Sequence, residues 1–211
     1  VNQDMRVRFT LVPDEERVDN DKLLPAFKEK LPKDSRIIVT GGAKGLGLHM
    51  VKEMNYENGP QILVLGRSKE PTEELAKLAG FGKNLSYGQA DVTDEETLQK
   101  VIGNWLNDKG KSSKDNSAND GNSPAVDLMV HSAGIEVSRS ISRKSLAEFL
   151  KVYKVKVDGL KNLVQATGGA KVLINFSSVA GLFGNLGQTD YAAANGFLDW
   201  VQPPKVEKTL N

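Results

Sequence analysis

The stretch that decides the fold is RIIVTGGAKGLG, residues 36–47 of the chain. Its first half contains a short run of β-branched apolar residues, which leads directly into a glycine-rich turn. An amphipathic segment, residues 48–54, follows this turn. A strand, a glycine loop and a helix in this order are typical of the opening of a dinucleotide-binding βαβ unit. We therefore expect a nucleotide cofactor to bind against this loop.

Three glycines of the loop have separate steric roles in this interpretation. Gly41 allows a sharp turn, Gly45 allows the backbone to approach a pyrophosphate, and Gly47 allows the helix to pack closely on the strand. The first N–H groups of the helix then point at the phosphates. The spacing is T-G-x-x-x-G-x-G, and a purely structural turn is the alternative interpretation. The predicted cofactor contacts of this loop are Thr40, Gly41, Gly42, Lys44, Gly45, Leu46 and Gly47.

The composition excludes several classes of function. The 211 residues suit one domain with a full core, and a net charge of +1 suggests no nucleic-acid or membrane partner. The chain has no cysteine, and His49 and His131 are not in a zinc-ligand spacing, so we expect no metal site. No apolar run approaches the ~20 residues of a membrane helix. These absences, with no visible signal peptide, favour a cytoplasmic location.

Strand-like and helix-like patterns alternate along the chain. This alternation predicts an α/β fold of Rossmann-like type, a doubly wound parallel sheet with helices on both faces, in three α/β/α layers. The predicted strands after the first are residues 61–65, 85–90, 126–131 and 171–176. The predicted helices after residues 48–54 are 73–79, 95–106, 145–162 and 191–201, with a loop at 177–187.

The segments outside this pattern define the predicted domain. Residues 1–35 are interpreted as an N-terminal strand, at 5–12, and a charged linker. Residues 107–124 are poor in apolar side chains, which predicts a mobile surface insertion. Residues 202–211 are interpreted as a tail. The cofactor-binding domain is therefore expected to span residues 36–201.

The end of the second strand predicts the identity of the coenzyme. Arg67 and Ser68 follow this strand, at the place where the adenosine ribose lies in such folds. An acidic residue here would bind a free 2′-hydroxyl, whereas a guanidinium fork suits a 2′-phosphate. Lys44 would add a second positive charge. The sequence thus favours NADPH over NADH, and a solvated surface arginine is the alternative.

The ends of the next two strands supply the remaining predicted cofactor contacts. Asp94 is expected to cap the helix that follows the third strand. His131, at the end of the fourth strand, is expected to be structural, with its ring satisfied locally. The predicted contacts are Asp91 and Val92 near the adenine, and Ser132, Ala133 and Gly134 near the nicotinamide ribose.

Four polar side chains form the candidate catalytic set. Tyr191 and Asn195 are one helical turn apart and share a face. Ser178 follows the fifth strand, and Lys156 lies on the preceding helix. Carbonyl reduction needs hydrogen-bond donors for the growing negative charge and then a proton. A phenol has a pKa near ~10, and a nearby ammonium moves that pKa toward the working range.

Three segments resemble the ketoreductase domains of polyketide and polyunsaturated-fatty-acid synthases, members of the short-chain dehydrogenase/reductase superfamily. They are HSAGIEVSRS (131–140), KVDGLKNL (156–163) and FSSVAGLFGNLGQTDYAAANGFLD (176–199). The resemblance covers residues 36–201. It implies NADPH-dependent reduction of a β-ketoacyl thioester held by an acyl carrier protein, beside other synthase domains.

The resemblance also implies a role for each catalytic candidate. Tyr191 is the proton donor, and Ser178, the second serine of its pair, donates a hydrogen bond to the carbonyl oxygen. Lys156 binds the nicotinamide ribose and lowers the phenol pKa, with Lys154 as its rival. Asn195 supports the proton network. Free-standing members of the superfamily read Tyr-x-x-x-Lys, whereas this chain reads Tyr-Ala-Ala-Ala-Asn.

The end of the chain departs from the family pattern. Residues 200–211 contain two prolines and several charges. We expect them to form none of the elements that the family places here, namely a further strand, a substrate lid and a last strand. This departure motivates one alternative, a non-catalytic reductase fold within a synthase. A free-standing alcohol dehydrogenase or reductase is a further alternative, against which the missing Tyr-x-x-x-Lys argues.

Overall fold

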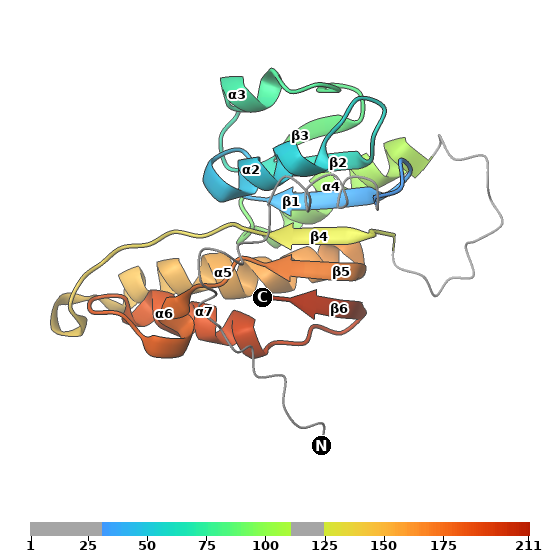
Figure 1. The fold of residues 1–211 in the computed structure, drawn as a ribbon. Coiled ribbons are helices and arrows are strands. Elements are labelled where there is room, and N and C mark those ends of the chain that lie inside the picture. The colour runs from blue at the N-terminus through green and yellow to red at the C-terminus, as the bar shows by residue number, and fades with distance from the viewer. Residues whose placement is uncertain (1–30, 111–124) are drawn as a thin grey trace, which may run out of the picture.

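The computed structural model describes residues 31–110 and 125–211, which form one six-stranded sheet with helices packed on it (Figure 1). All described strand pairs are parallel, and the strand order is β3-β2-β1-β4-β5-β6. The strands are β1 (Arg36–Thr40), β2 (Gln61–Gly66), β3 (Leu85–Gln89), β4 (Leu128–His131), β5 (Ala170–Asn175) and β6 (Val206–Leu210).

Helices lie between consecutive strands in the chain, because parallel strands need long crossover connections. None of the described helices is both long and apolar enough to pass through a membrane. The helices are α2 (Gly45–Met54), α3 (Glu73–Ala76), α4 (Glu95–Gly110), α5 (Leu146–Thr167), α6 (Val179–Phe183) and α7 (Thr189–Trp200), with a 3-10 turn η2 (Ile141–Arg143).

The two sides of β1 show why the fold has three layers. Ile38 belongs to the core on one side, where residues of α4, α5 and α7 pack, including Leu160. Its neighbours Ile37 and Val39 belong to the core on the other side, with Val51 of α2. Alternate residues of a strand face opposite sides, and both sides of this central strand are fully buried. The predicted three-layer, doubly wound fold is therefore confirmed.

The tail predicted at residues 202–211 is wrong, because β6 lies there and pairs with β5. Val206 is buried, whereas Glu207 and Lys208 are exposed, so the strand shows little apolar pattern. Charged residues are typical of an edge strand, which needs only one side covered. The two prolines precede the strand instead of interrupting it. Among residues 31–110 and 125–211, no helix follows α7.

Smaller differences concern element boundaries. The predicted loop at 177–187 contains the short helix α6. Helix α4 continues to Gly110, four residues into the predicted insertion, and α5 continues to Thr167. The strand expected at residues 5–12 and the rest of the insertion, 111–124, lie outside the described residues.

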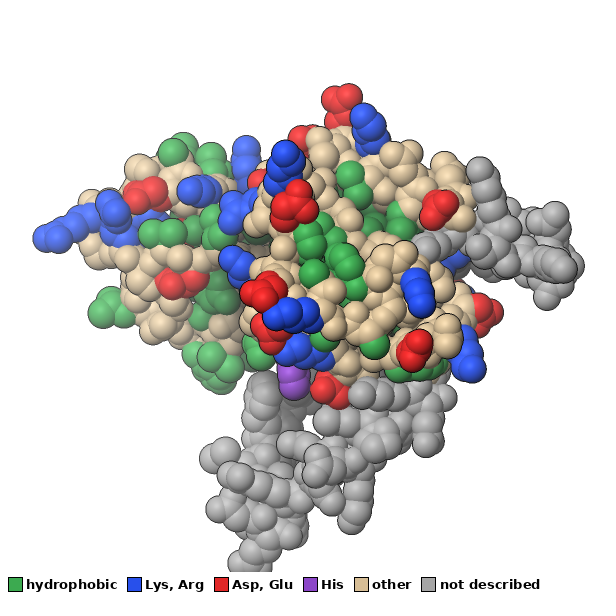
Figure 2. Space-filling view, turned by 90° about the horizontal axis from the view of Figure 1, so that it is seen from above, with side chains coloured by type: hydrophobic (Ala, Val, Ile, Leu, Met, Phe, Trp, Pro, Cys, Tyr) green, Lys and Arg blue, Asp and Glu red, His purple; other side chains and the backbone are tan. Residues whose placement is uncertain are grey.

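One end of the molecule carries exposed apolar side chains. In the space-filling view, green side chains gather at the projecting end on the left, where Figure 1 shows α6 (Figure 2). Leu182, Phe183 and Leu186 are exposed there. This end lies on the side of the sheet to which the strands' carboxyl ends point.

Candidate active site

The candidate site lies where the sheet order reverses, between β1 and β4. The chain turns to opposite sides after these two strands, and ligands of doubly wound folds bind in the resulting crevice. A pocket of about 270 Å³ occupies this position. Eight of the predicted site residues line it: Gly41, Lys44, Leu46, Gly47, Ser132, Gly134, Lys156 and Tyr191.

The glycine loop has the close contacts expected of a phosphate-binding turn. Gly41 has φ +70°, and a Cβ there would lie 2.9 Å from the backbone of Ser132 and Ala133. A Cβ on Gly47 would lie 2.5 Å from Gly41 O. Gly45 has φ +54° with open space around it. The loop therefore tolerates no side chain where it packs and stays open where a ligand would approach.

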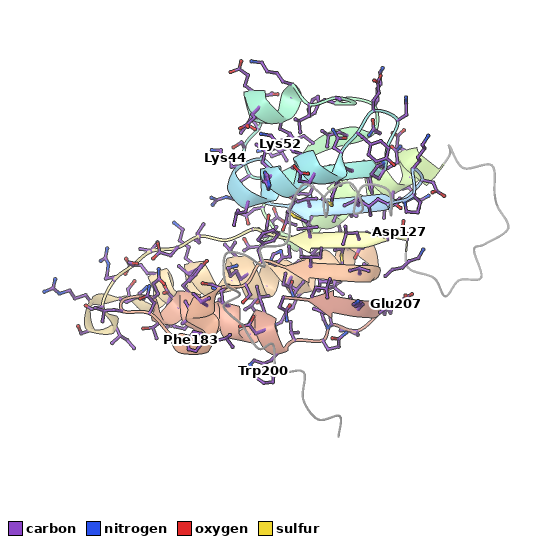
Figure 3. All side chains as sticks on the ribbon, in the orientation of Figure 1. Lys44, Lys52, Asp127, Phe183, Trp200 and Glu207 are labelled. Atoms are coloured by element: carbon purple, nitrogen blue, oxygen red, sulfur yellow. The ribbon has the colours of Figure 1, made fainter. Side chains whose placement is uncertain are left out.

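The N-terminus of α2 forms one wall of the pocket. Lys44 is its N-cap residue and makes no side-chain capping bond, and the first turn holds no acidic side chain. Lys44 is exposed at the end of the sheet where the strands finish, opposite Asp127 and Glu207 (Figure 3). The helix dipole and this ammonium together favour an anion in the pocket.

Lys156 and Tyr191 meet on the opposite wall. Lys156 Nζ lies 5.6 Å from the centroid of the Tyr191 ring and donates a hydrogen bond of 2.7 Å to Phe176 O. The lysine is buried, and burial lowers its pKa to about 8, although the Asp199 carboxylate acts in the opposite direction. No described residue bonds to the Tyr191 hydroxyl, so this group is free to meet a ligand.

Asn195 is placed one turn after Tyr191, as predicted. Its Nδ2 donates to Tyr191 O over 2.7 Å, and the residue is fully buried. Its Oδ1 is also buried and accepts no hydrogen bond from the described residues. A buried acceptor without a partner is unusual and marks a place where a donor fits.

The structure corrects which of the two serines after β5 lines the pocket. Ser177, and not the predicted Ser178, lines the pocket, and its Oγ donates 2.5 Å to Asp199 Oδ1. Ser178 is the N-cap of α6, where its Oγ accepts a bond of 3.2 Å from Ala180 N. The Ser178 hydroxyl proton has no acceptor among the described residues and remains available for donation.

His131 is structural, as expected, and connects the two walls. Its Nε2 bonds to Lys156 O at 3.0 Å, so this nitrogen carries the proton because a carbonyl can only accept. Its Nδ1 therefore accepts from Thr40 Oγ1 at 2.9 Å. Burial, then the Lys156 charge, lowers the His131 pKa to about 4. The predicted contact Thr40 thus has its hydroxyl committed to the interior.

The predicted adenosine contacts lie outside this pocket, at the ends of the neighbouring strands. Arg67 is exposed after β2 and makes no ion pair with any described residue. Asp91 Oδ1 accepts from Thr93 N at 2.9 Å, a local turn. Asp94 Oδ1 accepts from Thr97 N at 3.1 Å, which confirms its capping role. The other predicted contacts outside the lining are Gly42, Gly45, Ser68, Val92 and Ala133.

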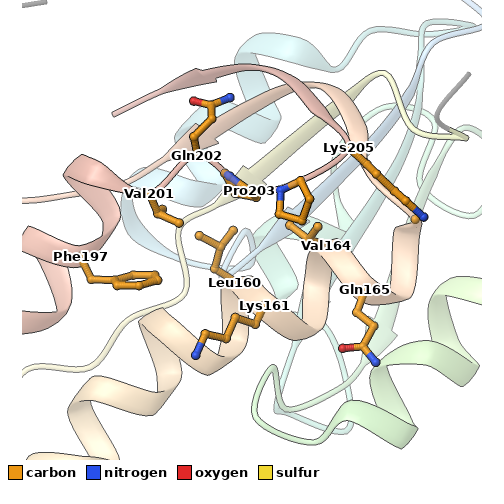
Figure 4. Close-up of a pocket in the computed structure, with 11 residues that line it drawn as sticks. Leu160, Lys161, Val164, Gln165, Phe197, Val201, Gln202, Pro203 and Lys205 are labelled. Atoms are coloured by element: carbon orange, nitrogen blue, oxygen red, sulfur yellow. The ribbon is translucent and has the colours of Figure 1, made fainter. Parts of the chain in front are cut away.

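A larger cavity, of about 580 Å³, lies between α5 and the connection from α7 to β6 (Figure 4). Its walls include Leu160, Val164 and Phe197, with Lys161 and Lys205 as its charged residues. It holds no acid–base pair and no glycine turn of the phosphate-binding type, so the smaller pocket is the candidate active site. The described residues contain no cluster of three or more acidic, histidine or cysteine side chains able to hold a metal.

Four lining residues were not predicted: Ile135, Glu136, Phe176 and Ser177. Ile135 and Glu136 follow the predicted Gly134 directly, so extending the predicted contact segment by two residues would have included them. Phe176 and Ser177 precede the predicted Ser178 in the same way. Asp199, which binds Ser177, continues the helical face of Tyr191 and Asn195 at i+4 spacing.

Known proteins share both this sequence pattern and this fold. A family model described as "KR domain" matches residues 35–209. "Erythronolide synthase EryA3" of Saccharopolyspora erythraea is 30% identical over 172 residues, which are 80% of this chain and 5% of that protein. "3-oxoacyl-[acyl-carrier-protein] reductase FabG" of Chlamydia pneumoniae is 27% identical over 168 residues, 75% of this chain and 61% of that one.

A solved structure agrees with these sequence relatives. The "N-terminal ketoreductase from macrolactin assembly line" has a TM-score of 0.67 and 26% identity, covering 80% of this chain and 33% of that chain. The present chain thus spans only a small part of the synthases it matches. Fold, glycine loop and the family match over residues 35–209 agree, and the chain belongs to the KR family, the ketoreductase domains of the short-chain dehydrogenase/reductase superfamily.

Proposed function

We propose that this chain is an NADPH-dependent ketoreductase that reduces a β-ketoacyl thioester, carried by an acyl carrier protein of a synthase, to the β-hydroxyacyl product. The proposal rests on one observation: Tyr191, Lys156 and the glycine loop line a single pocket at the reversal of the sheet. The relatives are parts of synthases and 3-oxoacyl-carrier-protein reductases by name, which supports the same substrate class.

The residues present fit a dinucleotide. The contacts that a Cβ would make at Gly41 and Gly47 leave space only for glycine, so the backbone can pass close to a pyrophosphate. Lys44 and the start of α2 supply positive charge for it. Arg67, exposed and without an ion-pair partner among the described residues, suits the 2′-phosphate of NADPH.

The protein's own groups then manage the charge that forms on the substrate. A bound reduced nicotinamide would supply the hydride. As the carbonyl oxygen gains negative charge, the Tyr191 hydroxyl donates its proton and the Ser178 hydroxyl donates a hydrogen bond. Lys156, with a pKa of about 8, is mostly charged at neutral pH and stabilises the phenolate. Asn195 holds the backbone of Tyr191 in place.

The Tyr191→Phe variant tests this function. It removes the proton donor and keeps the ring, so reduction of a β-ketoacyl pantetheine thioester should fall by about 10²–10⁴-fold. NADPH binding, followed by nucleotide fluorescence, should change little. Tyr153→Phe is the matched control, because Tyr153 lies on α5 with its ring stacked on Phe149 at 6.1 Å. Wild-type turnover in Tyr191→Phe would show that the proton comes from elsewhere.

A further inference from the structure

An ion pair beside the catalytic tyrosine is buried to an unusual degree. Lys144 Nζ lies 2.6 Å from Asp190 Oδ1, and the two side chains are 2% and 0% exposed. The other described ion pairs have at least one partner that is a third or more exposed; the most buried of them, Arg139–Glu148, has side chains 50% and 30% exposed. Exposed pairs fluctuate and contribute little, whereas a fully buried pair is held in one geometry.

Asp190 joins this pair to Tyr191. Asp190 is the residue directly before Tyr191 in the first turn of α7, and its Oδ1 accepts from Tyr191 N at 2.9 Å as well as from Lys144. Its second oxygen is buried and accepts no hydrogen bond from the described residues. The carboxylate therefore depends on Lys144 for charge compensation.

Lys144 joins the pair to a different part of the pocket wall. Its Nζ also donates to Val137 O over 2.8 Å. Val137 follows Ile135 and Glu136, which line the pocket together with Tyr191. One ammonium thus connects the segment after β4 with the start of α7, two stretches 53 residues apart in the chain.

Contacts of Arg139 join the same two parts of the structure as the ion pair does. Arg139 N donates to Gly187 O over 2.9 Å, and Arg139 Nη2 lies 3.2 Å from Glu148 Oε1 at the start of α5. Gly187 has φ +78°, and a Cβ there would lie 3.2 Å from Arg139 N. The segment 135–144 is therefore also held at Arg139, both to the turn before α7 and to the start of α5.

Stability alone does not account for a buried ion pair. The desolvation of two charges offsets much of their attraction, and well-packed apolar residues often replace such pairs without loss. A pair of this kind is more useful where it specifies one geometry. Here that geometry is the position of the catalytic phenol relative to the wall formed by Ile135 and Glu136.

We propose that Lys144 and Asp190 are positioning residues, which fix Tyr191 against the 135–144 segment and so align the proton donor with the bound ketoacyl group. This inference rests on the proposed reductase function of Tyr191. Neither side chain lines the pocket, so both act through their neighbours and not by touching the substrate.

Three variants separate positioning from simple stability. Lys144→Met leaves the Asp190 charge buried and unpaired, and Lys144→Met/Asp190→Asn removes that charge while its amide oxygen still accepts from Tyr191 N. Lys151→Met, at an exposed position on α5, is the matched control. Each variant is measured for kcat and KM with a β-ketoacyl pantetheine thioester, for NADPH affinity and for the thermal unfolding temperature.

The expected result is a divergence between stability and rate. Lys144→Met should lower kcat about 10- to 100-fold, because a small misplacement of a catalytic group has that effect, with NADPH affinity within about twofold of wild type. The double variant should recover the unfolding temperature but not kcat, because nothing then joins Val137 to α7. A kcat that recovers together with stability, or a Lys144→Met variant that loses only stability, would overturn the positioning role.

Hydrogen exchange provides a readout that is independent of turnover. Faster amide exchange in both 135–144 and 187–192, in Lys144→Met and in the double variant but not in Lys151→Met, would support the connection between them. Unchanged exchange would overturn it. A wild-type protein that reduces no ketoacyl thioester would instead refute the proposed function, and the exchange result would still decide whether the pair joins the two segments.

Discussion

Replacing Lys156 with methionine is expected to make the unliganded protein more stable while removing the proposed reductase activity. Burial lowers the pKa of Lys156 from 10.5 to about 8. At about 1.4 kcal/mol per pKa unit, the charged form therefore costs the folded state about 3 kcal/mol at pH 7, relative to the unfolded chain. Methionine has a similar shape and carries no charge.

Part of this gain is lost with the hydrogen bond to Phe176 O, which has a length of 2.7 Å. A hydrogen bond from a charged donor contributes about 1.5–3 kcal/mol, so the net stabilisation of Lys156→Met at pH 7 should be about 0–1.5 kcal/mol. The lowered pKa of Lys156 also predicts how the stability difference between the two proteins depends on pH. The folded group releases its proton near pH 8 and the unfolded group near 10.5, so the wild type gains stability between these values and the difference shrinks.

Urea unfolding at pH 7 and at about pH 9.5, followed by circular dichroism, measures this difference. The slope of free energy against urea should be the same in both proteins, so that a shift of midpoint reports stability. Lys151→Met, at an exposed site on the same helix, should change stability by less than about 0.5 kcal/mol. A Lys156→Met protein less stable than wild type at pH 7, or a difference that grows with pH, would refute the reasoning.

Three further predictions concern the glycine loop, the buried histidine and the coenzyme. Gly47→Ala should weaken NADPH binding at least about tenfold, because its Cβ would lie 2.5 Å from Gly41 O; Gly103→Ala, with nothing within 4 Å of its Cβ, should not. Equal NADPH affinities in fluorescence titrations would contradict this. Folded His131 has a pKa of about 4, so its titration should lower the free energy of unfolding of the wild type by about 3 kcal/mol as the pH falls from 6.5 to 4. Urea titrations that show the same loss in His131→Gln would contradict this prediction. Arg67→Glu should reduce kcat/KM for NADPH about 10- to 100-fold while sparing NADH, and unchanged coenzyme preference would assign Arg67 to the solvated surface.

The regular part of the fold could be predicted because its signals are local. The β-branched runs in β1 and β2 follow directly into turns, and the residues of α5 repeat their apolar stripe over several helical turns. Helix ends were harder to predict. Helix α5 ends at Thr167, five residues later than the predicted Asn162, and Gly168 with φ +71° forms its C-cap.

The elements that were missed depend on their neighbours. β6 has exposed charges and only one buried side chain, Val206, and it is a strand because β5 presents an unpaired edge to it. The short helix α6 depends on Ser178, which can equally be read as a turn residue until its bond to Ala180 N is seen. Both elements have only five residues, so their apolar spacing is too short to distinguish them from loop sequence.

Much of the candidate site followed from spacing alone. Tyr191 and Asn195 share a helix face at i+4, and the glycines of residues 41–47 precede a helix that follows a strand, so local periodicity predicted both groups. Local patterns also predicted the capping by Asp94 and the structural role of His131.

By itself, the sequence determined that strands and helices alternate, that the sheet is parallel with both faces covered, and which helix face carries the phenol. The tertiary structure alone decided that Lys156 lies 5.6 Å from the Tyr191 ring, that Ser177 lines the pocket, and that Lys144 reaches Asp190. The physical reason is that periodicity reports one element at a time. Distances between elements, and the burial that lowers the Lys156 pKa to about 8, arise only when separate elements pack together.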